Sequence, residues 1–331
     1  MDAPTEVIKR VKFRAMGTQV ELAAIPESHQ SSQEVEQAFD AAKRRITYLE
    51  QRLSRFDQKS DVSYINSQTG RFVRVSMETV TVVELALEAY QVSQGLFCPW
   101  MGEVIEQLGY NVSFEQIDES AFGGPGGVGR FGRVSAVPVR DFTAGSLPVY
   151  VEPEGNLVRM DAGFHLDLGG LAKGWIVEQA VNEFTNRGFH NIVVSAGGDL
   201  MCRGKQLGGP WTAGIVNPWD DSDSLFRLDI ENLALATSGT YRRRWQTTHG
   251  EVHHLLDPRT GRPSDSDVVS CSVLANRLTG AEVLAKTALL LGREQGMRWL
   301  QKQSQRGYVI ITREKEVFHA WNSSMNAKSW Q

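Results

Sequence analysis

The chain has 331 residues, of which 41% are hydrophobic and 22% are charged, and its formal net charge at pH 7 is −4. These values are ordinary for a globular protein with a large core, and they give no basic footprint that would indicate a nucleic-acid ligand. Cys98, Cys202 and Cys271 are far apart in the sequence, so we expect reduced thiols rather than a disulfide framework.

The N-terminal residues lack a charged segment followed by an apolar run, and no apolar stretch reaches the roughly 18–20 residues that a membrane span requires. We therefore expect a soluble, cytoplasmic protein for the chain as given. The same sequence would remain after removal of an export signal, and a periplasmic or membrane-anchored protein would then be expected.

In the first half of the chain, apolar periodicity and polar caps predict a strand broken at Met16-Gly17-Thr18, two long helices and a short helix. In order, these are Lys9–Ile25, Gln33–Leu53, Ser76–Ser93 and a segment that ends at Leu108. The polar segment Ser54–Asn66 either binds a ligand or, as its local pattern favours, leaves the first helix and caps another at Ser60. Phe114–Ala144 is rich in glycine and is predicted to be a flexible surface insertion.

The second half mixes strands and helices. We predict a hairpin over Val149–Met160, followed by a helix over Trp175–Phe184. Strands are predicted over Asn191–Val194, Pro210–Pro218, Leu225–Leu235 and Val268–Ala275. The chain then forms helices over Gly280–Leu291 and Arg293–Gln303 and a closing strand over Gly307–Thr312. No internal repeat or linker divides the chain, so we expect one domain over residues 1–331.

Four short polar turns, each with glycine, occur within about 100 residues: His165–Trp175, Ala196–Asp199, Ala236–Arg242 and His253–Gly261. Backbone N–H groups at such turns, together with the ammonium of Lys173, suit a phosphate-bearing ligand. The alternative is that these are ordinary structural turns and that the lysine is solvated.

Titratable residues in and near these turns extend the hypothesis. Mg²⁺ prefers a few carboxylates together with phosphate oxygens, and the candidate carboxylates are Asp167, Asp199, Asp257 and Glu282. His254 is a candidate proton carrier, with a purely structural histidine as the alternative. The residues alone therefore indicate an α/β enzyme that handles a phosphorylated ligand, with Mg²⁺ as a candidate ion.

Nine segments, in a single order, make the chain resemble the ApbE family of FAD:protein FMN transferases: Phe13–Thr18, Ser54–Asn66, Gly95–Gly102, Leu166–Trp175, Ser195–Asp199, Trp211–Pro218, Ala236–Tyr241, His254–Gly261 and Ala281–Gly292. The resemblance implies an α+β, T-fold-like architecture of mixed or antiparallel sheets with packed helices. It also implies transfer of the FMN half of FAD to a Thr or Ser hydroxyl of a target flavoprotein, with Mg²⁺ and with release of AMP. An FAD pyrophosphatase that forms FMN and AMP, and a non-catalytic FAD-binding protein, are the alternatives.

The same resemblance implies which residues contact FAD: Met16, Phe56, Leu96, Phe97, Cys98, Asp167, Lys173 and His254. Lys173 is implied as a positive clamp on the diphosphate, and His254 as either the acceptor of the hydroxyl proton or a group that orients the flavin. The backbone carbonyl of Gly170 is implied as a metal ligand.

The chain departs from the family pattern at the metal. Members carry Asp and Thr at helix positions i and i+4, where this chain has Glu282 and Lys286. Glu282 can ligate Mg²⁺, but an ammonium has no acceptor. Either Thr287 replaces the missing ligand, or Lys286 supplies positive charge near the phosphates, or Lys286 forms an ordinary i, i+4 pair with Glu282. Cys98 stands where the family has an aspartate.

Overall fold

The computed structural model of the protein describes residues 8–110, 112, 147–247, 250–321 and 327–329. The insertion predicted near residues 114–144 lies outside this part of the chain. Within the described ranges, no helix combines the length and the apolar character that crossing a membrane requires.

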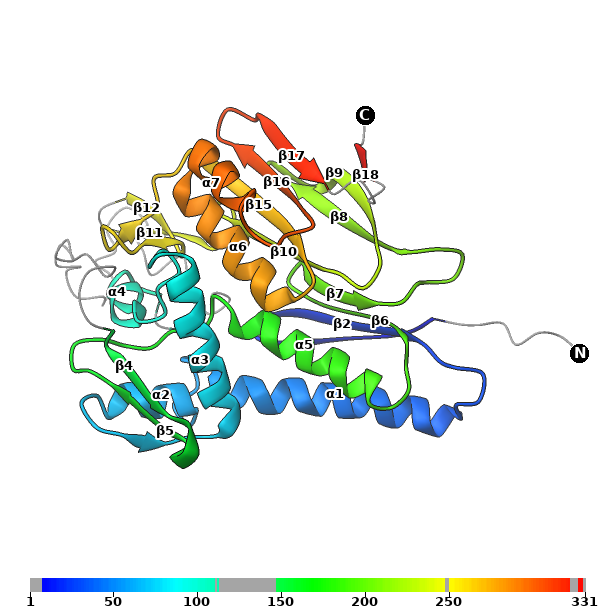
Figure 1. The fold of residues 1–331 in the computed structure, drawn as a ribbon, viewed down its shortest axis with the longest axis horizontal. Coiled ribbons are helices and arrows are strands. Elements are labelled where there is room, and N and C mark those ends of the chain that lie inside the picture. The colour runs from blue at the N-terminus through cyan, green and yellow to red at the C-terminus, as the bar shows by residue number, and fades with distance from the viewer. Residues whose placement is uncertain (1–7, 111, 113–146, 248–249, 322–326, 330–331) are drawn as a thin grey trace, which may run out of the picture.

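An eight-stranded sheet forms the centre of the molecule, and all its paired strands are antiparallel (Figure 1). Its strands, in spatial order, are β1 (Lys9–Ala15), β2 (Thr18–Ile25), β6 (Asn191–Ala196), β7 (Asp199–Arg203), β10 (Ala234–Gly239), β15 (Val268–Ala275), β16 (Gly307–Thr312) and β17 (Val317–Trp321). Every residue of β15 and β16 is buried, which indicates that this part of the sheet is covered on both faces.

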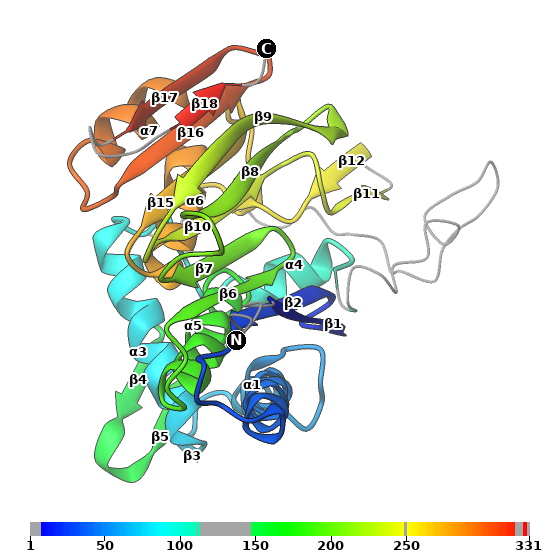
Figure 2. The same cartoon turned by 90° about the vertical axis from the view of Figure 1, so that its right-hand side faces the viewer.

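Helices cover one face of the sheet (Figure 2): α1 (Ser32–Leu53), α5 (Ala172–Thr185), α6 (Leu278–Leu291) and α7 (Arg293–Leu300). The apolar face of α1 packs against α5, where the rings of Phe39 and Phe184 meet edge to face at 4.9 Å. Beyond them lie α2 (Asp61–Ser67), α3 (Met77–Val92), α4 (Gly102–Gln107) and a small sheet of β3 (Val73–Arg74), β5 (Leu157–Met160) and β4 (Val149–Glu152), with the 3₁₀ turn Pro153–Gly155 between β4 and β5.

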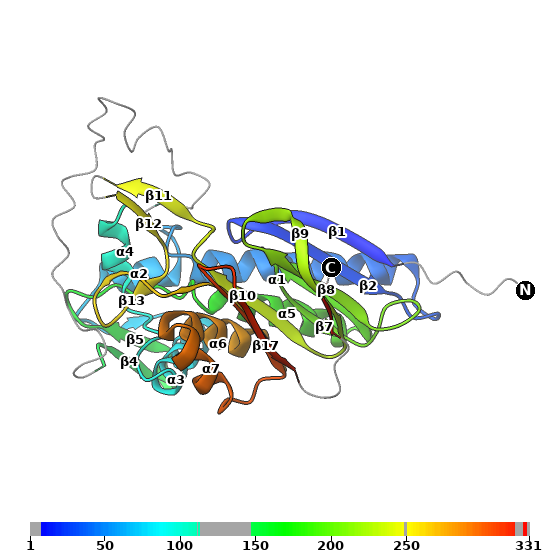
Figure 3. The same cartoon turned by 90° about the horizontal axis from the view of Figure 1, so that it is seen from above.

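A second, three-stranded sheet covers the other face. It consists of β8 (Trp211–Asn217), β9 (Asp220–Ile230) and β18 (Ala327–Ser329). Alternate residues of β8, such as Trp211 and Ile215, pack on Leu235 and Val309 of the large sheet. Two short ribbons complete the fold, β11 (Arg244–Thr247) with β12 (Gly250–His253) and β13 (Leu256–Asp257) with β14 (Arg262–Pro263) (Figure 3).

Most of the predicted elements are confirmed, and the predicted α+β class agrees with this architecture. The predicted strand Leu225–Leu235 is wrong as one element, because β9 ends and β10 begins within it, separated by a turn at Asn232 with φ 54°. The predicted turn Ala236–Arg242 largely belongs to β10. Its polar residues are tolerated inside the sheet because the Thr237 and Ser272 hydroxyls pair across β10 and β15 at 2.8 Å.

Several connections meet at one end of the large sheet. The turn between β1 and β2 lies beside the turn between β6 and β7, and the Gly197 N–H donates to the Gln19 carbonyl at 3.1 Å. The C-terminal half of β10 runs past the start of β7 at this same end. The antiparallel order thus brings glycine-bearing turns from distant parts of the chain together.

Helices α5 and α6 approach each other closely at Gly174, beside these turns. A Cβ placed on Gly174 would lie 2.5 Å from Glu282 Oε2 and 3.2 Å from the Leu278 carbonyl carbon. The Gly174 N–H donates to Glu282 Oε2 at 2.9 Å. A glycine is therefore needed inside α5, although glycine costs about 1 kcal/mol relative to alanine in a helix interior.

Gly174→Ala is expected to destabilise the protein by about 1–3 kcal/mol, because the added methyl group overpacks the contact between α5 and α6. Gly280 of α6 has open space around its Cβ position and serves as the matched control. Gly280→Ala should stabilise by up to about 1 kcal/mol through helix propensity alone. Urea denaturation of both variants measures this difference, and two shifts of the same sign would contradict the packing argument.

Candidate active site

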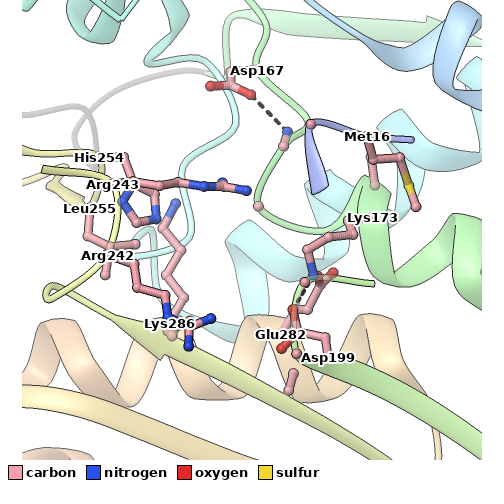
Figure 4. A pocket seen from close by; sticks show the side chains of 18 of the residues that line it. Met16, Asp167, Lys173, Asp199, Arg242, Arg243, His254, Leu255, Glu282 and Lys286 are labelled. Atoms are coloured by element: carbon pink, nitrogen blue, oxygen red, sulfur yellow. Dashed lines mark hydrogen bonds and ion pairs between the residues drawn. The ribbon is translucent and has the colours of Figure 1, made fainter. Parts of the chain in front are cut away.

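The turns at the end of the large sheet enclose a cavity of about 640 Å³. This volume lies within the range of small-molecule and cofactor sites. The wall is formed by the β1–β2 and β6–β7 turns, the end of β10, the segment around Asp167, the N-terminal turn of α5, and one side of α6 (Figure 4). The loops around Arg55 and Arg243 complete it.

Helix α5 begins at Ala172, three residues before the predicted start at Trp175. Lys173 therefore lies in the first turn of this helix. Its ammonium is engaged by two carboxylates, Asp199 Oδ2 and, at 2.5 Å, Glu282 Oε1. The remaining oxygens of the two acids are also used: Asp199 Oδ1 accepts from the Thr237 N–H at 2.7 Å, and Glu282 Oε2 accepts from Gly174. The predicted clamp lysine therefore lines the cavity with its charge already neutralised.

Burial and the neighbouring charges shift the pKa values of Glu282 and Lys173. Desolvation, together with the nearby Asp199 charge, raises the pKa of Glu282 to about 7, although Lys173 and the Gly174 N–H act in the opposite direction. For Lys173, desolvation lowers the pKa, but the charges of Asp199 and Glu282 outweigh it and the net shift is upward. The lysine therefore remains charged and holds the two acids together.

Asp167 is paired with Arg55 on the opposite side of the cavity. Asp167 Oδ2 lies 3.2 Å from Arg55 Nε, and Oδ1 accepts from the Gly169 N–H at 2.8 Å. The guanidinium of Arg55 is also close to the rings of Phe56 and Tyr110, with ring centroids at 4.1 and 4.8 Å. This cluster gives the cavity an aromatic side with a fixed carboxylate.

Lys286 points into the cavity from α6, one helical turn after Glu282 (Figure 4). Its Nζ lies 5.2 Å from the centroid of the Phe97 ring and would be 3.5 Å from a Cβ on Gly170. Within the described part of the chain it forms no ion pair, so the i, i+4 pair with Glu282 considered from the sequence is absent. Desolvation lowers the pKa of Lys286, and the charge of Asp167 partly compensates.

His254 lies beside Lys286 and Arg243 on the same wall (Figure 4). Desolvation, followed by the charges of Arg243 and Lys286, lowers the pKa of His254 well below 6.5, so the ring is neutral at physiological pH. The Arg243 backbone accepts a hydrogen bond from the ring, whereas Nδ1 is buried and has no partner among the described residues. The neutral ring thus carries an acceptor nitrogen.

The structure brings most of the predicted site residues together but leaves four away from the large cavity: Leu96, Phe97, Cys98 and Thr287. Met16, Phe56, Gly170 and the residues described above line it. Phe97 and Cys98 line a small adjoining cavity of about 40 Å³, and burial raises the pKa of the Cys98 thiol to about 12. Leu96 instead belongs to the apolar cluster that contains Leu284, Ala285 and Ala288 of α6.

Thr287 does not line either cavity. It lies five positions after Glu282, which places it about 140° around the helix axis. Its side chain is fully buried, and its hydroxyl has no hydrogen-bond partner among the described residues.

The predicted metal-binding residues do not fit Mg²⁺. The two oxygens of Glu282 are already occupied by Lys173 and Gly174, Lys286 has no lone pair to donate, and Thr287 lies outside the cavity. Among the residues that the structure describes, no group of three or more His, Cys, Asp or Glu side chains could hold a metal ion. The ammonium of Lys286 also opposes a second cation beside Gly170.

Sequence reasoning missed Arg55, Tyr110 and Arg243. Arg55 stands next to the predicted Phe56, and its burial beside Asp167 depends on a contact that spans more than 100 positions. Arg243 follows the polar segment that ends at Arg242, and its backbone has a left-handed φ of 49°. The run of three arginines from 242 to 244 was the available signal. Only the structure shows that Arg242 and Arg243 line the cavity, and that Arg242 is paired with Asp221.

Lys173→Met should destabilise the protein by about 3–5 kcal/mol, because it leaves Asp199 and Glu282 close together without their cation. Lys286→Met is the matched control from the same cavity. It removes a cation that has no ion-pair partner in the described ranges, so its effect should stay within about 1 kcal/mol or be stabilising. Urea unfolding compares them, and equal effects would mean that the two lysines do not differ as described.

Comparisons with known proteins show which proteins this chain is similar to. FAD:protein FMN transferase of Vibrio cholerae is 26% identical over 289 residues, which cover 85% of this chain and 81% of that protein. The FAD:protein FMN transferase of Treponema pallidum is 27% identical over 288 residues, with 83% and 77% covered.

Solved structures share the fold. The ApbE protein of Thermotoga maritima superposes with a TM-score of 0.78 at 23% identity and covers 95% of this chain and 97% of its own. Flavin transferase ApbE from Vibrio cholerae gives a TM-score of 0.74 at 23% identity, with 96% and 98% covered. The model of the ApbE family matches residues 16–311, and the chain therefore belongs to the ApbE family.

Proposed function

We propose that the protein is an FAD:protein FMN transferase, which moves the FMN half of FAD to a Thr or Ser hydroxyl of a target flavoprotein. The observation that carries this proposal is the wall where neutral His254 lies between two cations, Arg243 and Lys286. A base beside positive charge is what attack of a hydroxyl on a phosphate requires. The names of the relatives support flavin as the transferred group.

The proposed reaction is a single phosphoryl displacement. The acceptor oxygen forms a bond to the FMN phosphorus, and the bond between that phosphorus and the bridging oxygen breaks. The proton of the hydroxyl passes to His254, and AMP leaves with the bridging oxygen. Catalysis of this class depends on positioning and on neutralising the phosphate charge.

His254 suits the role of base because its lowered pKa keeps the ring unprotonated. The hydrogen bond to the Arg243 backbone fixes the tautomer, and Nδ1 retains the lone pair. Because Nδ1 is buried, proton transfer through it requires a movement of the ring that opens this nitrogen to the cavity, and orienting the flavin is the alternative role.

Other residues would bind and orient FAD. Phe56 and Tyr110, held by Arg55, offer an aromatic surface for a flat ring, and Asp167 offers a carboxylate to its polar edge. Lys173 acts as a positioning residue, because its ion pairs fix the start of α5 against α6. Mg²⁺ has no part in the proposed step, because the residues present do not fit this ion.

The transfer is tested by incubating the protein with FAD and a flavoprotein domain that carries a candidate acceptor threonine. We expect covalent flavin fluorescence on the acceptor in denaturing gels and one AMP per flavin transferred. A Thr→Val variant of the acceptor is the control and should remain unlabelled. Formation of AMP and free FMN without labelling would indicate a pyrophosphatase, and FAD retention without AMP a binding protein.

His254→Gln should lower the transfer rate by about 10²- to 10⁴-fold, because the side chain amide cannot accept the proton. FAD affinity, measured by fluorescence titration, should change by less than about threefold. A parallel loss of affinity and rate would instead assign His254 to FAD binding.

A further inference from the structure

Two cations in the cavity form no ion pair with the residues that the structure describes. Lys286 Nζ touches the face of Phe97 but makes no ion pair or hydrogen bond within the described ranges. The guanidinium of Arg243 likewise has no such partner among the residues the structure describes, whereas its neighbours Arg242 and Arg244 pair with Asp221 and Glu251. Placing two partly desolvated cations near each other is unfavourable unless an anion lies between them.

The two cations lie in the same part of the cavity. Both line the large cavity, both charges depress the pKa of His254, and Figure 4 shows both on the His254 side. Across the cavity, Lys173 is paired with two acids, Asp199 and Glu282. The His254 side therefore carries two positive charges without an ion pair in the described ranges, and the first carboxylate whose charge acts on Lys286 is Asp167, which is itself paired with Arg55.

We propose that Lys286 and Arg243 form a cationic clamp that binds the FAD diphosphate and takes the place of a divalent cation in this chain. The diphosphate of a dinucleotide carries two negative charges, so the clamp matches it charge for charge. The inference rests on the proposed function, because it assumes that FAD occupies the cavity. It explains why position 286 carries an ammonium beside Gly170, where the resemblance implied a metal.

The clamp also accounts for Glu282. A carboxylate that ligates a metal needs free oxygens, but both oxygens of Glu282 accept hydrogen bonds from α5. The acid anchors Lys173 and Gly174, and a metal ion bound to the same carboxylate would lie next to the ammonium of Lys173. Charge neutralisation on the phosphates then has to come from side chains.

FAD binding in EDTA tests the clamp directly. By fluorescence titration, the Kd of the unaltered protein should change by less than about threefold between excess EDTA and millimolar Mg²⁺. Lys286→Met and Arg243→Gln should each weaken FAD binding about 10- to 100-fold in EDTA, the size expected for a charge-assisted contact. Their riboflavin affinity should change by less than about threefold, because riboflavin has no phosphate.

Lys205→Met is the matched control, since Lys205 is exposed and pairs with Glu231 away from the cavity. It should bind FAD as the unaltered protein does. The double variant Glu282→Asp/Lys286→Thr restores oxygen ligands at both positions, and its FAD affinity should then increase at least about tenfold with Mg²⁺.

Three outcomes would overturn the clamp: loss of FAD affinity by tenfold or more when EDTA is added to the unaltered protein, an unchanged Kd for Lys286→Met, or an equal loss of riboflavin affinity. If the acceptor is flavinylated while one of these occurs, the clamp fails and the proposed function stands. If FAD binds in EDTA through both cations but no acceptor is labelled, the clamp stands and the transfer fails. If FAD does not bind under any condition, both fail.

Discussion

The contact between α5 and α6 at Gly174 is the constraint on which the site depends. Only a glycine lets the Glu282 carboxylate reach the α5 backbone, and the same carboxylate also holds Lys173. Lys173 in turn holds Asp199, whose other oxygen accepts from β10 at Thr237. One close helix contact therefore ties both helices to the β6–β7 turn and to β10, and fixes three walls of the cavity.

Local patterns predicted the elements well where burial is periodic. The bounds of β15 and β16 agree with the prediction because continuous apolar runs mark strands covered on both faces. The segment around Asn232 was predicted poorly: asparagine favours the left-handed region, but the apolar residues on both sides of it indicated one continuous strand. The Thr and Ser residues of β10 resemble a turn until their partners on β15 are known.

The sequence predicted which residues lie at the site, but not which of these residues pair with one another. Lys173, Lys286 and Glu282 were all expected there, yet the sequence could not show that Glu282 pairs with the lysine 109 positions away rather than the one four positions away. This pairing exchanges the roles expected of the two lysines. Lys173 is structural, and Lys286 is available to a ligand. The partner of a charge depends on tertiary contacts, which spacing along one helix does not determine.

The two unpaired cations on the His254 wall couple the stability of the protein to the binding of its ligand. An anion that enters the cavity relieves repulsion between Arg243 and Lys286 as well as adding its own contacts, so the loaded form gains stability in both ways. Proteases act on transiently opened chains, and the empty form opens more often. A chain whose cavity holds the anion is therefore better protected against proteolysis than a chain whose cavity is empty.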